Sequence, residues 1–177
     1  MFLVWSKSRP KCLVWHMPKK TITTKKKTSD RVDCIWGLTC SLSSIDQQRN
    51  NISLFNVIDQ LSIPKSEVDN LGKVEIVIPL EHEVVFVWRR LLHRDLCTDK
   101  VVTDVKISSL DPDGKIMGEV ITQLWFEPGN RIMRFRVQNS SFKITKEGDY
   151  IYRAEIIQPG TDKFERVMDI PYNVMFV

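Results

Sequence analysis

The strongest constraint on the fold is an alternation of apolar and polar residues, seen most clearly over residues 143–156 (KITKEGDYIYRAEI). A turn centred on Gly148 divides this stretch into two extended runs. In the second run one face is apolar, at Tyr150, Tyr152, Ala154 and Ile156. Because successive side chains of a strand point to opposite faces, the stretch predicts an antiparallel hairpin with one buried face.

Further runs of this kind follow one another from Asp33 to the C-terminus. The run at 83–91 (EVVFVWRRL) is apolar on both faces, as expected for a central strand. The run at 52–61 also fits a helix over its second half, because periodicity alone does not separate the two. The expected strands cover residues 33–42, 52–61, 73–80, 83–91, 101–110, 115–126, 131–138, 150–156 and 164–170.

Turn-forming residues separate these runs at short intervals. Asp-Pro-Asp-Gly at 111–114 and Glu-Pro-Gly-Asn at 127–130 are typical hairpin turns. Residues 62–72 predict a loop, with one helical turn begun by Pro64 and ended at Gly72. The sequence therefore predicts an all-β fold, a single antiparallel β-sandwich (immunoglobulin-like or jelly-roll-like) of about eight to nine strands.

The apolar phase of the runs also predicts the core. A buried side chain is expected wherever the apolar phase carries a large residue. In residues 33–42 this phase places Cys34, Trp36, Leu38 and Cys40 on one face. The predicted core comprises Trp36, Leu38, Leu54, Phe86, Trp88, Val105, Ile107, Leu124, Phe135, Tyr150, Tyr152 and Ile156.

Charge divides the chain into two parts. Residues 1–31 hold nine Lys and Arg against one Asp, a net charge of +8, while the rest holds 17 against 21, a net charge of −4. We expect a basic, disordered leader over residues 1–31 and one β-sandwich domain over residues 32–177. The leader is interpreted as a solvated tail, as sequence upstream of a true initiator at Met17, or as an arm for nucleic acid or an anionic membrane.

Neither a membrane span nor a metal site is predicted. No apolar run approaches 18 residues, and the one at the start is too short for a secretory signal, so the expected location is cytoplasmic. Cys34 and Cys40 lie six positions apart in one strand, roughly 20 Å, which is too far for a disulfide. No CxxC pair occurs, so we expect reduced thiols and no cofactor.

No group of residues predicts catalysis. In the Glu81-His82-Glu83 triplet the two carboxylates share one face and the histidine points to the other, so they do not converge. His93 and Cys97 have no third ligand nearby, and the turn at 111–114 lacks the fifth-position ligand of a calcium loop. There is no G-x-S-x-G elbow and no glycine-rich phosphate loop. A hydrolase with unrecognised residues remains an alternative.

One segment resembles a known family. Residues 40–61 (CSLSSIDQQRNNISLFNVIDQL) are similar to the N-terminal signature of a family of uncharacterised bacterial β-sandwich proteins, and the G-x-Y at 148–150 is consistent with it. The resemblance extends over the 145 residues from Asp33 onward. It implies a sandwich fold and a bacterial source, and it supplies no catalytic residues.

Arginines provide the candidate binding residues. They flank Trp88 on one strand and follow the polar face of another, at Arg89, Arg90, Arg131, Arg134 and Arg136. Such residues suit an anionic ligand, or they pair with acidic neighbours on a solvated face. Because the domain is net acidic, we expect a protein partner, and nucleic acid only through the leader. The predicted function is a non-catalytic binding or protein-interaction module, with a structural or assembly subunit as a further alternative.

Overall fold

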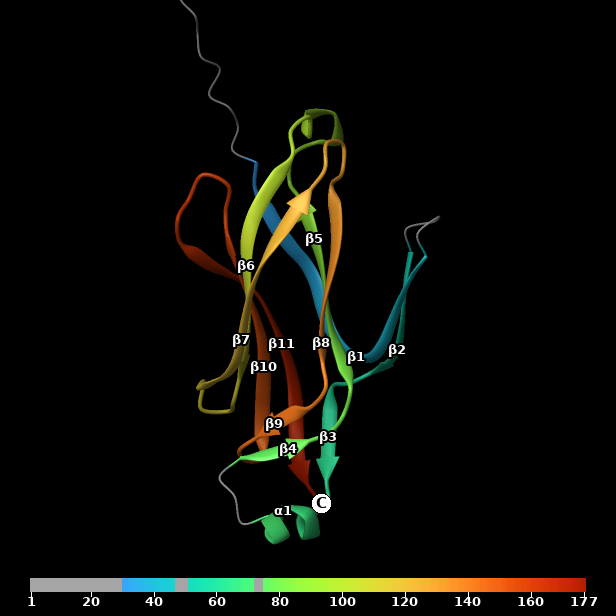
Figure 1. Ribbon diagram of the computed structural model, residues 1–177, viewed down its shortest axis with the longest axis vertical. Helices are drawn as coiled ribbons and strands as arrows, with labels where there is room; N and C mark the ends of the chain where they lie inside the picture. Colours follow the sequence, from blue (N-terminus) through green and yellow to red (C-terminus); the bar gives the residue numbers. More distant parts are fainter. Residues whose placement is uncertain (1–29, 47–50, 72–74) are drawn as a thin grey trace, which may run out of the picture.

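The computed structural model describes residues 30–46, 51–71 and 75–177. These residues form eleven strands in three sheets, with one short α-helix, α1 (Lys65–Leu71), and one 3-10 turn, η1 (Arg94–Leu96) (Figure 1). The all-β class is confirmed. The predicted single sandwich of eight to nine strands is wrong, because a third sheet is present and some expected strands are divided.

The two larger sheets contain nine of the strands. The first has the order β2 (Asn51–Val57), β1 (Val32–Asp46), β5 (His82–Arg90), β8 (Ile132–Asn139). The second has the order β3 (Gln60–Ile63), β11 (Phe164–Phe176), β10 (Gly148–Ile157), β6 (Val101–Leu110), β7 (Ile116–Phe126). The small third sheet pairs β4 (Ile76–Ile78) with β9 (Phe142–Ile144) and crosses one end of the molecule (Figure 1). All pairings are antiparallel except that of β3 with β11, which is parallel.

One hydrophobic core joins the sheets. Its buried members come from both larger sheets and from β4 and β9. Gly37 of β1 marks a close approach, because a Cβ there would lie 2.6 Å from the side chain of Ile170 on β11. The central strand predicted at 83–91 is confirmed: β5 lies between β1 and β8 and is buried on both faces.

Most of the predicted core is confirmed. Phe135 is partly buried against the core, and eight other predicted residues belong to it: Phe86, Trp88, Val105, Ile107, Leu124, Tyr150, Tyr152 and Ile156. Trp36, Leu38 and Leu54 do not. For the first two the reason is a β-bulge after Cys34, which pairs with Trp88, whereas Trp36 pairs with Val87. The extra residue reverses the phase of the strand, so Trp36 and Leu38 share the opposite face from Cys34.

The hairpin across 111–114 is confirmed. β6 and β7 pair along their whole length, and the Gly114 N–H donates to the Asp111 carbonyl at 2.9 Å. The Asp111 side chain accepts hydrogen bonds from the N–H groups of Asp113 and Lys115, at 3.0 and 2.8 Å. Gly114 has φ +79°, a conformation that favours glycine. The Asp111 side chain therefore closes the turn, with the geometry of an ordinary Asx turn.

The hairpin predicted over residues 143–156 is wrong in its pairing. β9 pairs with β4, and β10 pairs with β11 and β6. The connection is held by Tyr150, whose hydroxyl accepts from the N–H groups of Thr145 (2.8 Å) and Lys146 (3.1 Å) and donates to the Lys146 carbonyl (2.9 Å). The predicted buried face of β10 is confirmed by the alternating burial of its residues.

The segment 52–61 also departs from prediction. It contains two strands, β2 and β3, which belong to different sheets. Asn56 has φ +49° near the end of β2, a conformation that asparagine tolerates, and the strand ends there. The predicted helical turn after Pro64 is the seven-residue helix α1.

Most of the expected leader lies outside the described residues. Its last two residues, Asp30 and Arg31, are described and contact the domain. Arg31 forms an ion pair with Glu165 at 2.6 Å, and its carbonyl accepts from the Leu91 N–H at 2.8 Å. Asp30 pairs with the guanidinium of Arg90.

Candidate functional site

A hollow lies where two consecutive strands enter different sheets. β7 and β8 are joined by the turn at 127–130, yet β7 is the edge of one large sheet and β8 the edge of the other. Figure 1 shows the two strands close together near this turn and diverging away from it. A cleft of about 450 Å³ lies between them.

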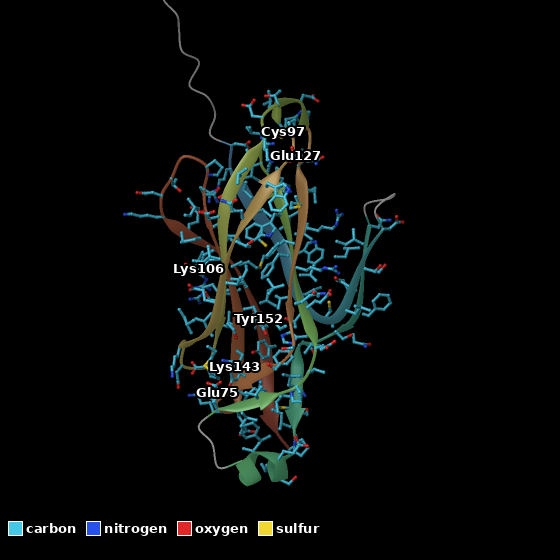
Figure 2. All side chains as sticks on the ribbon, viewed as in Figure 1. Glu75, Cys97, Lys106, Glu127, Lys143 and Tyr152 are labelled. Atoms are coloured by element: carbon cyan, nitrogen blue, oxygen red, sulfur yellow. The ribbon has the colours of Figure 1, made fainter. Side chains whose placement is uncertain are left out.

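Both edges and the floor contribute to this β7–β8 cleft. β7 supplies residues 117–120, and β8 supplies 137–139. Ile107 of β6 and Tyr152 of β10 are buried and form part of the floor. Figure 2 shows Tyr152 near the middle of the molecule and Lys143 below it. The cleft is therefore a gap between two sheet edges with a partly apolar base.

The polar groups of the cleft are mostly uncharged amides and hydroxyls. Two carry charge: Glu119, which accepts a hydrogen bond from Ser108 at 3.3 Å, and Lys143, which lies 3.6 Å from Glu75. The Asn139 side-chain nitrogen is buried and has no hydrogen-bond partner among the described residues. The neutral polar lining consists of Ser109, Gln138, Asn139, Ser140 and Ser141.

His82 is hydrogen-bonded to Tyr152 of the cleft floor, and both of its ring nitrogens are engaged. One nitrogen, Nδ1, is 3.0 Å from the Leu80 carbonyl and must donate to it. Burial lowers the pKa of His82, so the ring is neutral and Nε2 accepts from the Tyr152 hydroxyl at 2.7 Å. The ring stacks on Phe142 with centroids 3.6 Å apart. Burial also raises the pKa of Tyr152, so neither group is placed to act as a base.

Glu83 lies on the other side of the same strand end. It borders a second hollow of about 370 Å³, which shares residues 138–140 with the cleft. Its carboxylate accepts hydrogen bonds from the Ser43 N–H (2.8 Å), the Ser43 hydroxyl and the Gln138 amide (3.0 Å), and Arg136 lies 3.5 Å away. Burial opposes ionisation, but these donors and Arg136 together hold the pKa of Glu83 below its usual value.

We expect Glu83→Gln to lower the free energy of unfolding by about 1.5–3 kcal/mol at neutral pH, because a buried, charge-assisted network is lost. The folded pKa lies below the unfolded one, so this stabilisation is present above a pH of about 4.3 and is lost as the pH falls through the folded pKa. Urea titrations at several pH values should therefore show a flatter acid dependence for the variant. Ser43→Ala should move the loss to higher pH, and an unchanged profile in both variants would contradict the assignment.

The candidate arginines do not form one group. Arg134 pairs across strands with Val87, and Arg136 with Val85, so both lie on the face of their sheet away from the core. Arg89, one position before the core-facing Arg90, shares this outer face. Arg90 is 1% exposed, pairs with Asp30 and donates to the Asp99 carbonyl at 2.9 Å. Arg90 is thus a structural group, and Arg131 precedes β8 with its carbonyl bonded to the Arg90 N–H.

The remaining reactive groups are also engaged or isolated. Cys34, Cys40 and Cys97 are free thiols and buried, and burial with the nearby Asp33 raises the pKa of Cys34 to about 12. His93 is largely exposed and contacts Asp95 at 3.2 Å, away from either hollow. In the part of the chain that the structure describes, no three His, Cys, Asp or Glu side chains gather as a metal site would require.

No family model matches the chain, and no curated protein matches it. The resemblance of residues 40–61 therefore stays a prediction. One solved structure of limited similarity is a family 123 glycoside hydrolase from Clostridium perfringens, studied for glycolipid glycan hydrolysis, with 11% identity and a TM-score of 0.38. The match covers 80% of this chain and 27% of that one, so the chain spans about a quarter of that structure. A likeness of this size carries no argument about activity. Within the described ranges, no helix has the length and hydropathy needed to cross a membrane.

Sequence reasoning missed the cleft. Its residues at 138–141 are ordinary polar positions at a strand end, and no motif marks them. The cleft exists because β7 and β8 belong to different sheets. The residues of the turn at 127–130 do not reveal whether the two strands that it joins pair with each other. The only signal was the polar alternation of the strand that became β8.

Proposed function

We propose that this protein is a non-catalytic binding module that holds an extended segment of a partner protein in the β7–β8 cleft. One observation carries the proposal: the cleft is bounded by two strands that are each the edge of a sheet among the described residues. An edge strand has backbone N–H and C=O groups available to an added strand, and many peptide-binding domains use this mode.

The composition of β7 supports this use. The strand is eleven residues long, contains no proline and has Glu119 as its only charged residue. Its exposed apolar residues include Val120, 40% exposed on the cleft side, and Ile121, 56% exposed. Proteins usually protect long apolar edges with charges, prolines or bulges, because such edges pair with other chains. An edge left open beside a cleft is suited to a partner strand.

The polar lining supports a peptide ligand in preference to a reaction. Amides and hydroxyls match the donors and acceptors of a peptide backbone, and the buried Asn139 nitrogen is a donor without a partner in the described structure. A hydrolase would need a base or nucleophile facing the ligand. Here His82 and Tyr152 are hydrogen-bonded to each other, and His82 also to the Leu80 carbonyl. The Glu83 carboxylate is held by the Ser43 N–H and by other donors that lower its pKa.

The proposal is tested with a displayed library of random peptides, selected on the immobilised full chain. We expect peptides of β-forming composition whose affinity falls about tenfold or more in Val120→Lys, because a lysine on the edge obstructs strand addition. Val102→Lys is the matched control: Val102 is 50% exposed in the same sheet, but its strand β6 is an inner strand, and Val102 pairs with Trp125 of β7. It should bind as the wild type does.

Hydrogen exchange gives an independent reading of the same complex. Bound peptide should slow amide exchange in residues 117–121 of β7, since added-strand hydrogen bonds protect backbone N–H groups. Binding without protection in β7, or equal losses in the two lysine variants, would contradict strand addition. Hydrolysis of a glycoside or ester substrate by the purified chain, lost in Glu81→Gln or Glu83→Gln, would favour the hydrolase alternative.

Nucleic acid is not part of the proposal for residues 30–177. That region is net acidic, and one of the five candidate arginines, Arg90, is buried. We expect any weak binding of single-stranded oligonucleotides by the full chain to come from the lysine-rich residues before Asp30 and to vanish when they are removed. Titrations at about 0.05 and 0.2 M salt measure this, because phosphate contacts are salt-sensitive. Salt-sensitive binding that survives the truncation and is lost in Arg134→Ala and Arg136→Ala would contradict it.

A further inference from the structure

A second surface lies on the opposite sheet, on the face that points away from the core. The β-bulge after Cys34 places Trp36, Leu38 and Cys40 on this outer face. Beyond them Cys40 pairs with Val57, and Leu42 with Phe55. Directly opposed residues of antiparallel strands share a face. The result is an apolar stripe along β1 and β2, made of Trp36, Leu38, Leu42, Phe55 and Val57, with Cys40 fully buried among them.

The stripe is open to solvent where β1 and β2 form their hairpin. Leu42 is 54% exposed, Phe55 49% and Val57 57%. Figure 1 shows the β1–β2 hairpin standing away from the rest of the molecule, so no other described element covers it. Single exposed apolar residues are normal on a protein surface, but contiguous ones mark sites of interaction.

Arginines border the stripe on its other side. Across the sheet, Trp36 pairs with Val87, which pairs with Arg134, and Leu38 pairs with Val85, which pairs with Arg136. Arg136 is 45% exposed. The neighbouring carboxylate, Glu83, is buried, lies 3.5 Å from Arg136, and also accepts hydrogen bonds from Ser43 and Gln138. Arg89, in the next row, lies opposite Asp33. Three arginines (Arg89, Arg134 and Arg136) thus lie beside the stripe with two carboxylates (Asp33 and Glu83), so this rim has a net positive charge.

We infer that this outer face binds an apolar segment of another protein that carries acidic residues along one side. The apolar residues of the segment would cover Leu42, Phe55 and Val57, and its carboxylates would face Arg134 and Arg136. Tryptophan and arginine are the residues that most often dominate binding energy at such surfaces. A second copy of this chain fits less well, because a twofold contact would bring two positive rims together. This surface is independent of the β7–β8 cleft.

The test uses the same displayed library, selected on the full chain and then depleted on Phe55→Ser. Because Phe55 is half-exposed on an edge strand, the variant should fold, and circular dichroism checks that it does. Depletion leaves the peptides that need the stripe. We expect them to be rich in Asp and Glu interspersed with large apolar residues. Their affinity should fall tenfold or more in Phe55→Ser and several-fold in Arg136→Gln or at higher salt, and should be unchanged in Val102→Ser and Val120→Lys.

Three results would overturn the inference. The first is that the selected peptides are neutral or basic, or bind Phe55→Ser and wild type alike. The second is that the full chain dimerises in sedimentation while Phe55→Ser is a monomer, which would assign the face to a second copy. The third is that vesicles of phosphatidylglycerol bind the wild type and not Phe55→Ser, which would assign the face to a membrane surface. Loss of binding in Val120→Lys alone concerns the cleft and leaves this surface to be judged by Phe55→Ser.

Discussion

Replacing Trp88 by alanine is expected to lower the free energy of unfolding by about 3–5 kcal/mol. The side chain is fully buried on the central strand β5, with its ring 6.2 Å from that of Phe86. Strands on both sides of β5 hold the backbone in place, so the cavity left by the indole cannot close. The indole nitrogen has no partner among the described residues, so the loss is one of packing.

Urea or thermal unfolding measures this effect, and Trp125→Ala is its matched control. Trp125 lies on the edge strand β7 and is 50% exposed, so its removal should cost about 1 kcal/mol or less. Both variants lose one tryptophan, so their unfolding curves measured by tryptophan fluorescence can be compared directly. Similar midpoints for the two variants would show that Trp88 is not part of a rigid core.

The parts of the fold that were predicted correctly are those that depend on neighbours in sequence. The Asp-Pro-Asp-Gly turn specifies a hairpin within four residues, and β6 and β7 pair around it as expected. β5 and the buried face of β10 are specified by their own apolar pattern. Local chemistry is sufficient in these places because the interactions that decide the structure lie within the segment itself.

The predictions were wrong where the structure depends on residues that are distant in the sequence. One inserted residue at the bulge after Cys34 reversed the phase of β1 and placed Trp36 and Leu38 on the outer face. Alternation gives no sign of the bulge, because the apolar residues Cys34, Trp36, Leu38 and Cys40 keep the same two-residue spacing across it. Likewise, β7 and β8 surround a turn but enter different sheets, and β9 pairs with β4 in preference to β10. The β7–β8 cleft depends on these choices.

The contacts of Asp30 lead us to propose that the domain begins one or two residues before the expected boundary at Val32. A chain that begins at Arg31 or Val32 lacks Asp30, which supplies the carboxylate that pairs with Arg90. The Arg90 side chain is 1% exposed, and its guanidinium also donates to the Asp99 carbonyl at 2.9 Å. A chain that begins at Asp30 retains this pair. We therefore propose that Asp30, the acidic residue at the end of a basic segment, is a structural part of the domain.

We expect Asp30→Ala to lower the free energy of unfolding by about 3–5 kcal/mol, because it leaves a buried guanidinium without a counter-charge. Arg31→Ala is the control: its pair with Glu165 is largely exposed, at 57% and 40%, so the change should be about 0–1 kcal/mol. Unfolding in urea should separate the two neighbouring variants.

The double variant Asp30→Ala, Arg90→Met distinguishes the charge from the packing. Methionine fills part of the space of the arginine stem and carries no charge, so the double variant should regain much of the stability lost in Asp30→Ala. If Asp30→Ala were as stable as Arg31→Ala, water would be reaching Arg90 in place of the carboxylate. The domain would then begin at Val32, as charge and periodicity alone suggest.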